Sequence, residues 1–429
     1  MSLIKNLKTG FIHFFFLSLV VIFHATSVKA LPAFAIKEKV SCNMCHSNGS
    51  APHLTPYGYM YRRAGFRPPQ NIGNKDADSK TMTIYDHIAA GTNISYEFQT
   101  QKPLNTSDTK LVANQINVPE VEIWPLVGSF LGNFAAWSEI DASPSISGSA
   151  GSVALGMADL RYASGTPDFF FNFRAGYITS EGFGASDQWF DDGNTPLMDQ
   201  ASAYYNQDTL ALPFGAMGEP QMGAEFGLNY HDAHFTFGFY NGYNGLSGGL
   251  TAASTNQGGI SKDYKFQLDQ FLGDLGAITV GFYHGSIPLI DPSNTFNWAD
   301  QYNVGRLYLT YFAIPGTLDL LAGGALSSNQ YVTVDATPSG TFTSRGAFLG
   351  ALYYAMPHLS LGARLDFNQF STEATNSPAV ANGFSIQASL PFDNNIFNIA
   401  FNRTLSELAS GNITQGTTNN FRLSWRFLL

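Results

Sequence analysis

The sequence has 429 residues and a formal net charge of −10, an acidity that argues against nucleic acid as a partner. Only 13% of the residues are charged and 14% are aromatic, a balance that departs from that of soluble globular domains. After residue 30, no run of about 18 apolar residues predicts a membrane-spanning helix. Such a composition is typical of strands that are apolar on alternate residues only.

Residues 1–30 have the pattern of a cleaved secretory signal peptide. Lys5 and Lys8 form a basic start, residues 11–23 are a mainly apolar run, and Val28 and Ala30 offer a small-residue cleavage site. The run is too short for a spanning helix. Its removal would take three lysines and no acids, which moves the net charge from −10 to −13. We expect the mature chain to be exported.

Residues 31–80 contain the attachment pattern of a c-type haem, Cys42-Asn43-Met44-Cys45-His46. Two thiols at this spacing meet the two vinyl groups of haem, and the histidine that follows binds the iron from one face. A zinc site would need two further ligands, and a redox-active dithiol would need a surrounding βαβ unit; the sequence has neither. We therefore expect one covalent haem c on Cys42 and Cys45, with His46 as the proximal ligand.

The second axial ligand has several candidates, of which His53 and Met60 are equally favoured. Residues 47–52 could span roughly 20 Å when extended, so His53 could reach around the porphyrin. Met60 has a more comfortable loop, and methionine–histidine ligation is common in cytochromes c. The alternative for Met60 is an apolar side chain packed on a short helix over residues 57–65. Met82 and His87 are more distant candidates.

The segment also carries a basic cluster, Arg62, Arg63 and Arg67. Guanidinium groups suit carboxylates, so Arg62 and Arg63 are predicted to bind the haem propionates. The alternative is a basic patch that docks on an acidic barrel mouth. About fifty residues are too few to build a core without the cofactor, so apolar side chains should wall a haem crevice. The expected wall residues are Phe34, Leu54, Tyr57 and Phe66.

From about Thr83 onward, the sequence alternates apolar and polar residues in stretches of about ten, which predicts a β-barrel over residues 81–429. In the last stretch, Phe421 and Trp425 alternate with Arg422 and Ser424. The predicted strands are 84–100, 110–124, 126–141, 152–164, 168–179, 219–231, 233–242, 262–273, 276–286, 300–312, 316–328, 344–355, 358–370, 382–391, 394–405 and 419–429.

The predicted connections alternate between short and long, as they do in outer-membrane barrels with short periplasmic turns and long external loops. Short ones fall at 124–125, 313–316, 356–358 and 391–394, and long ones at 180–218, 243–261 and 329–343. A soluble β-sandwich would have no reason for this parity. The expected fold is therefore all-β, a 16-stranded antiparallel transmembrane barrel in outer-membrane lipid, with both barrel ends in the periplasm.

A barrel of this size leaves an aqueous lumen. Its inward charged side chains are expected to pair with one another rather than to catalyse a reaction. They are Arg174, Glu225, Asp269, Arg306, Arg364, Asp366, Arg422 and Arg426.

Four stretches of the sequence resemble the fused monohaem cytochrome–porins, the outer-membrane iron oxidases of iron-oxidising bacteria. They are residues 31–35, the haem pattern at 42–46, Leu-Thr-Pro-Tyr-Gly at 54–58 and Tyr-Arg-Arg-Ala-Gly-Phe at 61–66. Residues 117–122 are also similar. The resemblance is close over residues 31–69 and architectural beyond them. It implies an Fe(II)-oxidising oxidoreductase.

The combination of haem and pore itself favours electron transfer. The hydrocarbon band that must be crossed is roughly 25 Å tall, so a haem in the periplasmic mouth or lumen would be useful to reactants on both sides. We expect electrons to pass from extracellular Fe(II) to the haem and then to a periplasmic cytochrome. The alternatives are the same conduit running outward, or a solute porin with a haem-bearing plug. Asp187, Asp191 and Asp192 could gather Fe(II), or could be an ordinary acidic external loop.

Overall fold

The computed structural model describes residues 34, 38, 40, 42–46, 54–74, 88–104, 107–130, 132–143, 152–178, 221–241, 262–290, 296–333, 338–356, 358–372, 375–392, 395–406 and 416–428. The signal segment, the loops 180–218 and 243–261, and His53, Met82 and His87 lie outside these residues. Among the helices described, none is long and apolar enough to cross a membrane.

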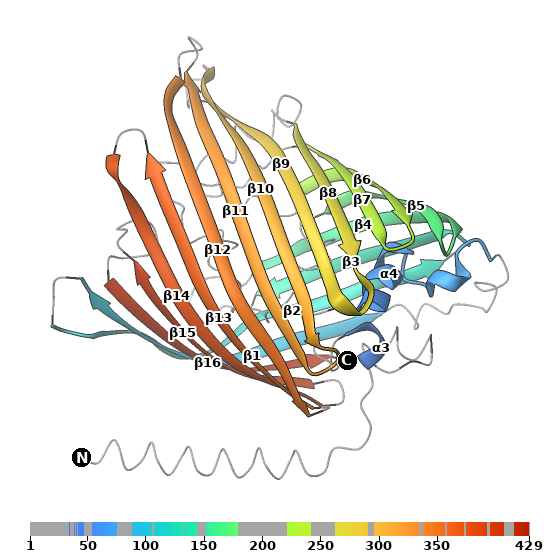
Figure 1. Ribbon diagram of the computed structural model, residues 1–429, viewed down its shortest axis with the longest axis horizontal. Coiled ribbons are helices and arrows are strands. Elements are labelled where there is room, and N and C mark those ends of the chain that lie inside the picture. Colours follow the sequence, from blue (N-terminus) through green and yellow to red (C-terminus); the bar gives the residue numbers. More distant parts are fainter. Residues whose placement is uncertain are drawn as a thin grey trace.

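Sixteen antiparallel strands form one closed barrel, which confirms the expected fold (Figure 1). Each strand pairs with the next, and β1 pairs with β16 from Gly91–Leu428 to Pro103–Gly416, which closes the cylinder. The strands are β1 Ala89–Pro103, β2 Lys110–Phe130, β3 Phe134–Ser143, β4 Ser152–Thr166, β5 Phe169–Ile178, β6 Gln221–Tyr230, β7 Ala233–Tyr240, β8 Asp263–Phe271, β9 Gly276–Ile290, β10 Phe296–Ile314, β11 Leu318–Thr333, β12 Pro338–Met356, β13 Leu359–Thr372, β14 Thr375–Phe392, β15 Asn395–Ser406 and β16 Gly416–Leu428.

The alternation of the sequence separates an apolar outer face from a polar inner face. On β5, Phe171 is 37% exposed to the outside, whereas its neighbour Phe170 is fully buried. Inward charges pair across the wall, as expected: Arg174 with Glu225 at 2.7 Å, and Arg426 with Glu122 at 3.1 Å. A closed barrel with an apolar exterior is built to lie in lipid.

The turn predicted at residues 124–125 is wrong. Strand β2 continues through Trp124 and Pro125 to Phe130, and β3 begins at Phe134 after a turn that includes Gly132 and Asn133. A proline is tolerated there for two reasons. Pairing with β1 ends at Trp124, and the ladder with β3 shifts register between Ile123 and Leu126, so no ladder requires the missing N–H of Pro125.

The connection predicted as long over residues 329–343 is short, so the predicted alternation of loop lengths is incomplete. Strands β11 and β12 pair as far as Val332 and Pro338, inside the predicted loop 329–343. Strands β13 and β14 likewise pair as far as Thr372 and Thr375. These extensions are rich in Ser, Thr, Asn and Gln. They lack apolar alternation in the sequence, so a period of two could not predict them.

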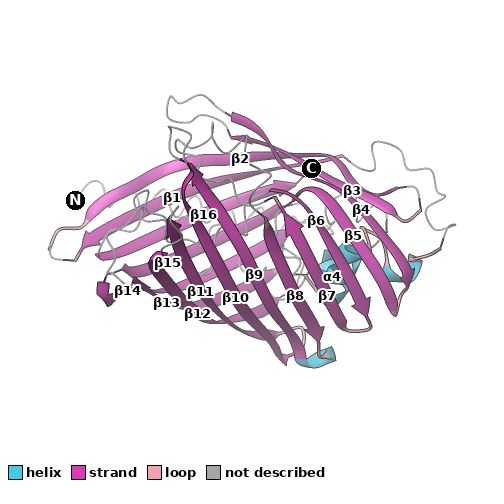
Figure 2. Ribbon diagram, turned by 90° about the horizontal axis from the view of Figure 1, so that it is seen from above, coloured by secondary structure: helices cyan, strands magenta, loops and turns pink. Residues whose placement is uncertain are grey.

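The N-terminal segment lies inside the barrel near the end that carries the short turns (Figure 2). It contains the short helix α3 (Cys42–Cys45), the helix α4 (Pro56–Arg63) and the 3-10 turn η2 (Pro69–Asn71). Helix α4 begins with Thr55 as its N-cap and Pro56 in its first turn, and ends before Gly65, whose φ is +73°. This closely matches the helix expected over residues 57–65.

Candidate functional site

Helix α3, which contains both cysteines, is held directly against the start of α4. The Thr55 N–H donates to the Cys45 carbonyl at 2.9 Å, and the Thr55 hydroxyl donates to the Met44 carbonyl at 2.6 Å. A Cβ on Gly58 would stand 2.0 Å from the Cys45 carbonyl oxygen, so only glycine permits this approach. His46 forms an isolated bridge with Leu54. Thr55 therefore caps α4 and fixes the haem-pattern residues in the same contact.

Beside this contact lies a cluster of aromatic rings. Phe34 stacks on Phe66 at 5.2 Å between ring centroids and meets Tyr61 edge-on at 5.6 Å, while Tyr57 stacks on Tyr61 at 6.4 Å. Burial, with Glu38 and Cys45 nearby, raises the pKa of Tyr61 well above its usual value, so its hydroxyl stays protonated. Three of the four expected wall residues thus gather here, whereas Leu54 packs in a different cluster.

Met60 packs toward the barrel wall. It contacts the cluster of Tyr59 and Phe271 and also the cluster of Ala64, Ile72 and Phe170. Gly58, which faces Cys45, is two residues away on α4 and so points to nearly the opposite side of the helix. The structure therefore places Met60 as the packed apolar side chain of the alternative interpretation. The identity of the distal ligand stays a prediction.

Arg63 is 2% exposed and is fully engaged with the barrel wall. Its guanidinium donates to the side chains of Asn229 at 2.6 Å and Thr236 at 3.0 Å, and to the Phe235 carbonyl at 2.9 Å. It also donates to the Tyr59 hydroxyl at 3.1 Å. These contacts correspond to the docking interpretation of the basic cluster, although the acceptors are neutral oxygens of β6 and β7.

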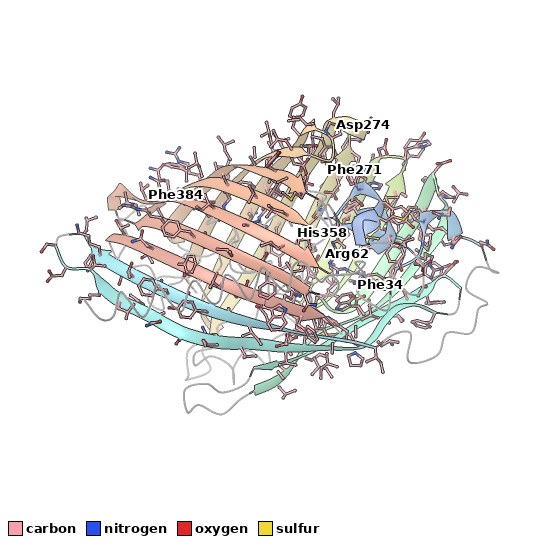
Figure 3. All side chains as sticks on the ribbon, turned by 90° about the horizontal axis from the view of Figure 1, so that it is seen from below. Phe34, Arg62, Phe271, Asp274, His358 and Phe384 are labelled. Atoms are coloured by element: carbon pink, nitrogen blue, oxygen red, sulfur yellow. The ribbon has the colours of Figure 1, made fainter. Side chains whose placement is uncertain are left out.

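Arg67, also 2% exposed, binds the turn between β2 and β3. Its guanidinium donates to the carbonyls of Gly132 and Phe134. Next to it, the Phe66 ring packs 4.3 Å from the guanidinium carbon of Arg161. Arg62 is only partly buried, and Figure 3 shows it with Phe34 and Phe271 around α4.

Asp269 of β8 completes the set of wall residues that hold α4, which also includes Asn229, Phe235 and Thr236 and is called the seat of α4 below. Sequence reasoning assigned Asp269 no such role. The Tyr59 hydroxyl donates to Asp269 Oδ2 at 2.6 Å, and Gln267 donates to the same oxygen at 2.8 Å. Thr279 donates to Oδ1 at 2.6 Å. The carboxylate is completely buried. The sequence placed Asp269 on the inner face but held no sign that its partner is 210 residues away.

No family model matches the chain, and no curated protein matches it. Solved structures share the barrel and little of the sequence. An anion-selective porin from Comamonas acidovorans superposes with a TM-score of 0.53 at 9% identity, over 80% of this chain and 98% of that chain. In-vitro folded OmpT of Vibrio cholerae, an outer membrane protein in its trimer form, gives a TM-score of 0.50 at 9% identity, over 80% and 100%. At such identity the likeness shows the fold of an outer-membrane barrel and nothing finer.

Proposed function

We propose that this chain is an outer-membrane electron conduit. In this proposal, extracellular Fe(II) gives up one electron and leaves as Fe(III), and a periplasmic cytochrome receives that electron. The observation that carries the proposal is the placement of a haem-attachment pattern in a segment seated inside a closed barrel, at the end with the short turns. A solute channel has no need of such a pattern, and a soluble cytochrome has no need of the barrel.

The residues around the pattern suit a haem c. Cys45 and His46 are half-buried, within reach of a cofactor and shielded from bulk water. The half-buried rings of Phe34 and Tyr57 in the cluster beside them are apolar groups of the kind that surround a porphyrin. When bound, the haem would supply reversible one-electron exchange. The chain would hold it through Cys42, Cys45 and the proximal ligand His46.

The other side chains would orient the group and set its surroundings. Arg62 is proposed to bind a propionate. The Arg63 guanidinium is bonded to the wall, so it is not proposed for that role. With Met60 packed toward the wall, His53 is the proposed distal ligand. Tyr61, kept protonated by burial, adds no negative charge to the crevice. The barrel would keep insoluble Fe(III) outside the periplasm while leaving the segment open to a soluble carrier.

The test begins with the cofactor. Purified wild-type protein should stain for haem peroxidase activity on a denaturing gel, and Cys45→Ala should greatly weaken or abolish the stain. Asn43→Ala, within the same pattern, is the matched control and should keep it. Added Fe(II) should then convert the absorption spectrum to its reduced form, and an oxidised periplasmic cytochrome should reverse the change. Wild-type protein without haem stain would end the proposal.

Two other functions have distinct outcomes in the same experiments. Reduction by a periplasmic donor but never by Fe(II) would reverse the direction, giving a conduit to extracellular acceptors. The porin-like barrel favours the second candidate, a solute channel in which the segment is only a plug. Solute-dependent conductance in a planar bilayer that is identical in wild type and Cys45→Ala would support it.

A further inference from the structure

We infer that Asp269 is a positioning residue for the N-terminal segment: through the Tyr59 hydroxyl it neutralises Arg63, and this buried charge pair fixes the orientation of α4 on the barrel wall. Where the inference concerns haem, it rests on the proposed function. Its structural part depends only on the contacts between α4 and β8.

Two buried charged groups are linked at the Tyr59 hydroxyl. Arg63 and Asp269 are both buried, and each would be costly to bury without an opposite charge. The guanidinium donates to the Tyr59 hydroxyl at 3.1 Å, which in turn donates to the carboxylate at 2.6 Å. One hydroxyl therefore links the cation of the segment to the anion of the wall, and this link exists only while α4 packs against β8.

The surrounding groups make the seat specific. Gln267 and Thr279 orient the carboxylate, and the Tyr59 ring packs against His234 and Phe271 at centroid distances of 5.4 Å and 5.2 Å. A segment shifted by one turn of helix would lose the ring contacts and both hydrogen bonds of the Tyr59 hydroxyl together.

The seat extends to the haem pattern through rigid contacts. Tyr59 is adjacent in sequence to Gly58, which packs directly on the Cys45 carbonyl, and Thr55 ties that carbonyl to the start of α4. A carboxylate on β8 thereby sets where His46 lies in the lumen. Weakening the hydrogen bond between Asp269 and Tyr59 should change the surroundings of the haem while both cysteines remain in place.

The experiment measures protease cleavage within residues 54–74 in the full-length, detergent-purified protein. Asp269→Asn and Tyr59→Phe should each speed cleavage roughly thirtyfold, which is about 2 kcal/mol at 1.4 kcal/mol per factor of ten. Tyr59→Phe leaves the wall unchanged, so it tests the link even if Asp269→Asn disturbs barrel folding. The matched control is Asp366→Asn, an inward carboxylate of β13 that pairs with Arg364 on its own strand.

The second measurement is the absorption spectrum and reduction potential of the haem, which Asp269→Asn should shift and Asp366→Asn should leave unchanged. Wild-type cleavage rates in both Tyr59→Phe and Asp269→Asn would overturn the inference. Absence of haem in the wild type would overturn the proposed function instead, and the cleavage rates would still decide whether Asp269 holds the segment.

Discussion

Replacing Gly58 with alanine would place a methyl group where α3 already lies. The new Cβ would stand 2.0 Å from the Cys45 carbonyl oxygen, whereas ordinary contact begins at 3.4 Å, so α3 must withdraw by the difference of 1.4 Å. Overpacking of this kind costs about 1–3 kcal/mol. Loss of the bond from Thr55 to Cys45 would add about 1 kcal/mol, which the higher helix propensity of alanine offsets. The net loss is about 1–3 kcal/mol, which lowers the ratio of molecules with α3 packed on α4 to molecules with α3 detached by roughly 5- to 150-fold.

Two assays would detect this loss. Gly58→Ala should lower the haem content per barrel and raise the rate of protease cleavage around residues 42–58. Gly305→Ala is the matched control, because a Cβ at this β10 glycine would meet no atom within 4 Å. Unchanged haem content and unchanged cleavage in Gly58→Ala would refute the contact between α3 and α4, and with it the path by which the barrel wall positions His46.

Two further predictions concern the ligand and the topology. His53→Ala should convert the haem spectrum toward the high-spin form and shift its potential, whereas Met60→Ala should change the spectrum little because Met60 packs against Tyr59 and Ala64; the reverse result would make Met60 the ligand. On whole cells, external protease should cut the loops 180–218 and 243–261 and spare residues 31–80. Cleavage of the spared segment, detected by mass spectrometry, would mean that the barrel is inserted the other way round.

The number of strands and their inward and outward faces were predictable because both follow from a period of two that is visible within each strand. The errors in strand ends and turns occurred where that period carries no information. At Trp124 and Pro125 the proline suggested a turn, but the missing N–H falls at a register shift with no partner on β1. At residues 329–343 the alternation stops although the strands pair as far as Val332 and Pro338.

The candidate site likewise has one part that the sequence predicts and one part that it does not. The haem-attachment pattern needs only five contiguous residues of specific chemistry, so the sequence alone predicts it, and the haem stays a prediction. The roles of Arg63 and Tyr59 were not readable, since their partners on the wall are 166 and 210 residues away. An inward asparagine such as Asn229 looks the same in the sequence whether it faces water or an arginine. Only the closed barrel brings these positions together.

The location of the seat also bears on how the molecule is assembled. The polar contacts of α4 and Arg67 described above involve β6 to β8 and the β2–β3 turn, whereas the seam that closes the cylinder is between β1 and β16. The first half of the sheet could therefore receive the segment while the seam is still open. The segment would enter sideways as the sheet curls around it, and closure of the seam would be the step that traps it.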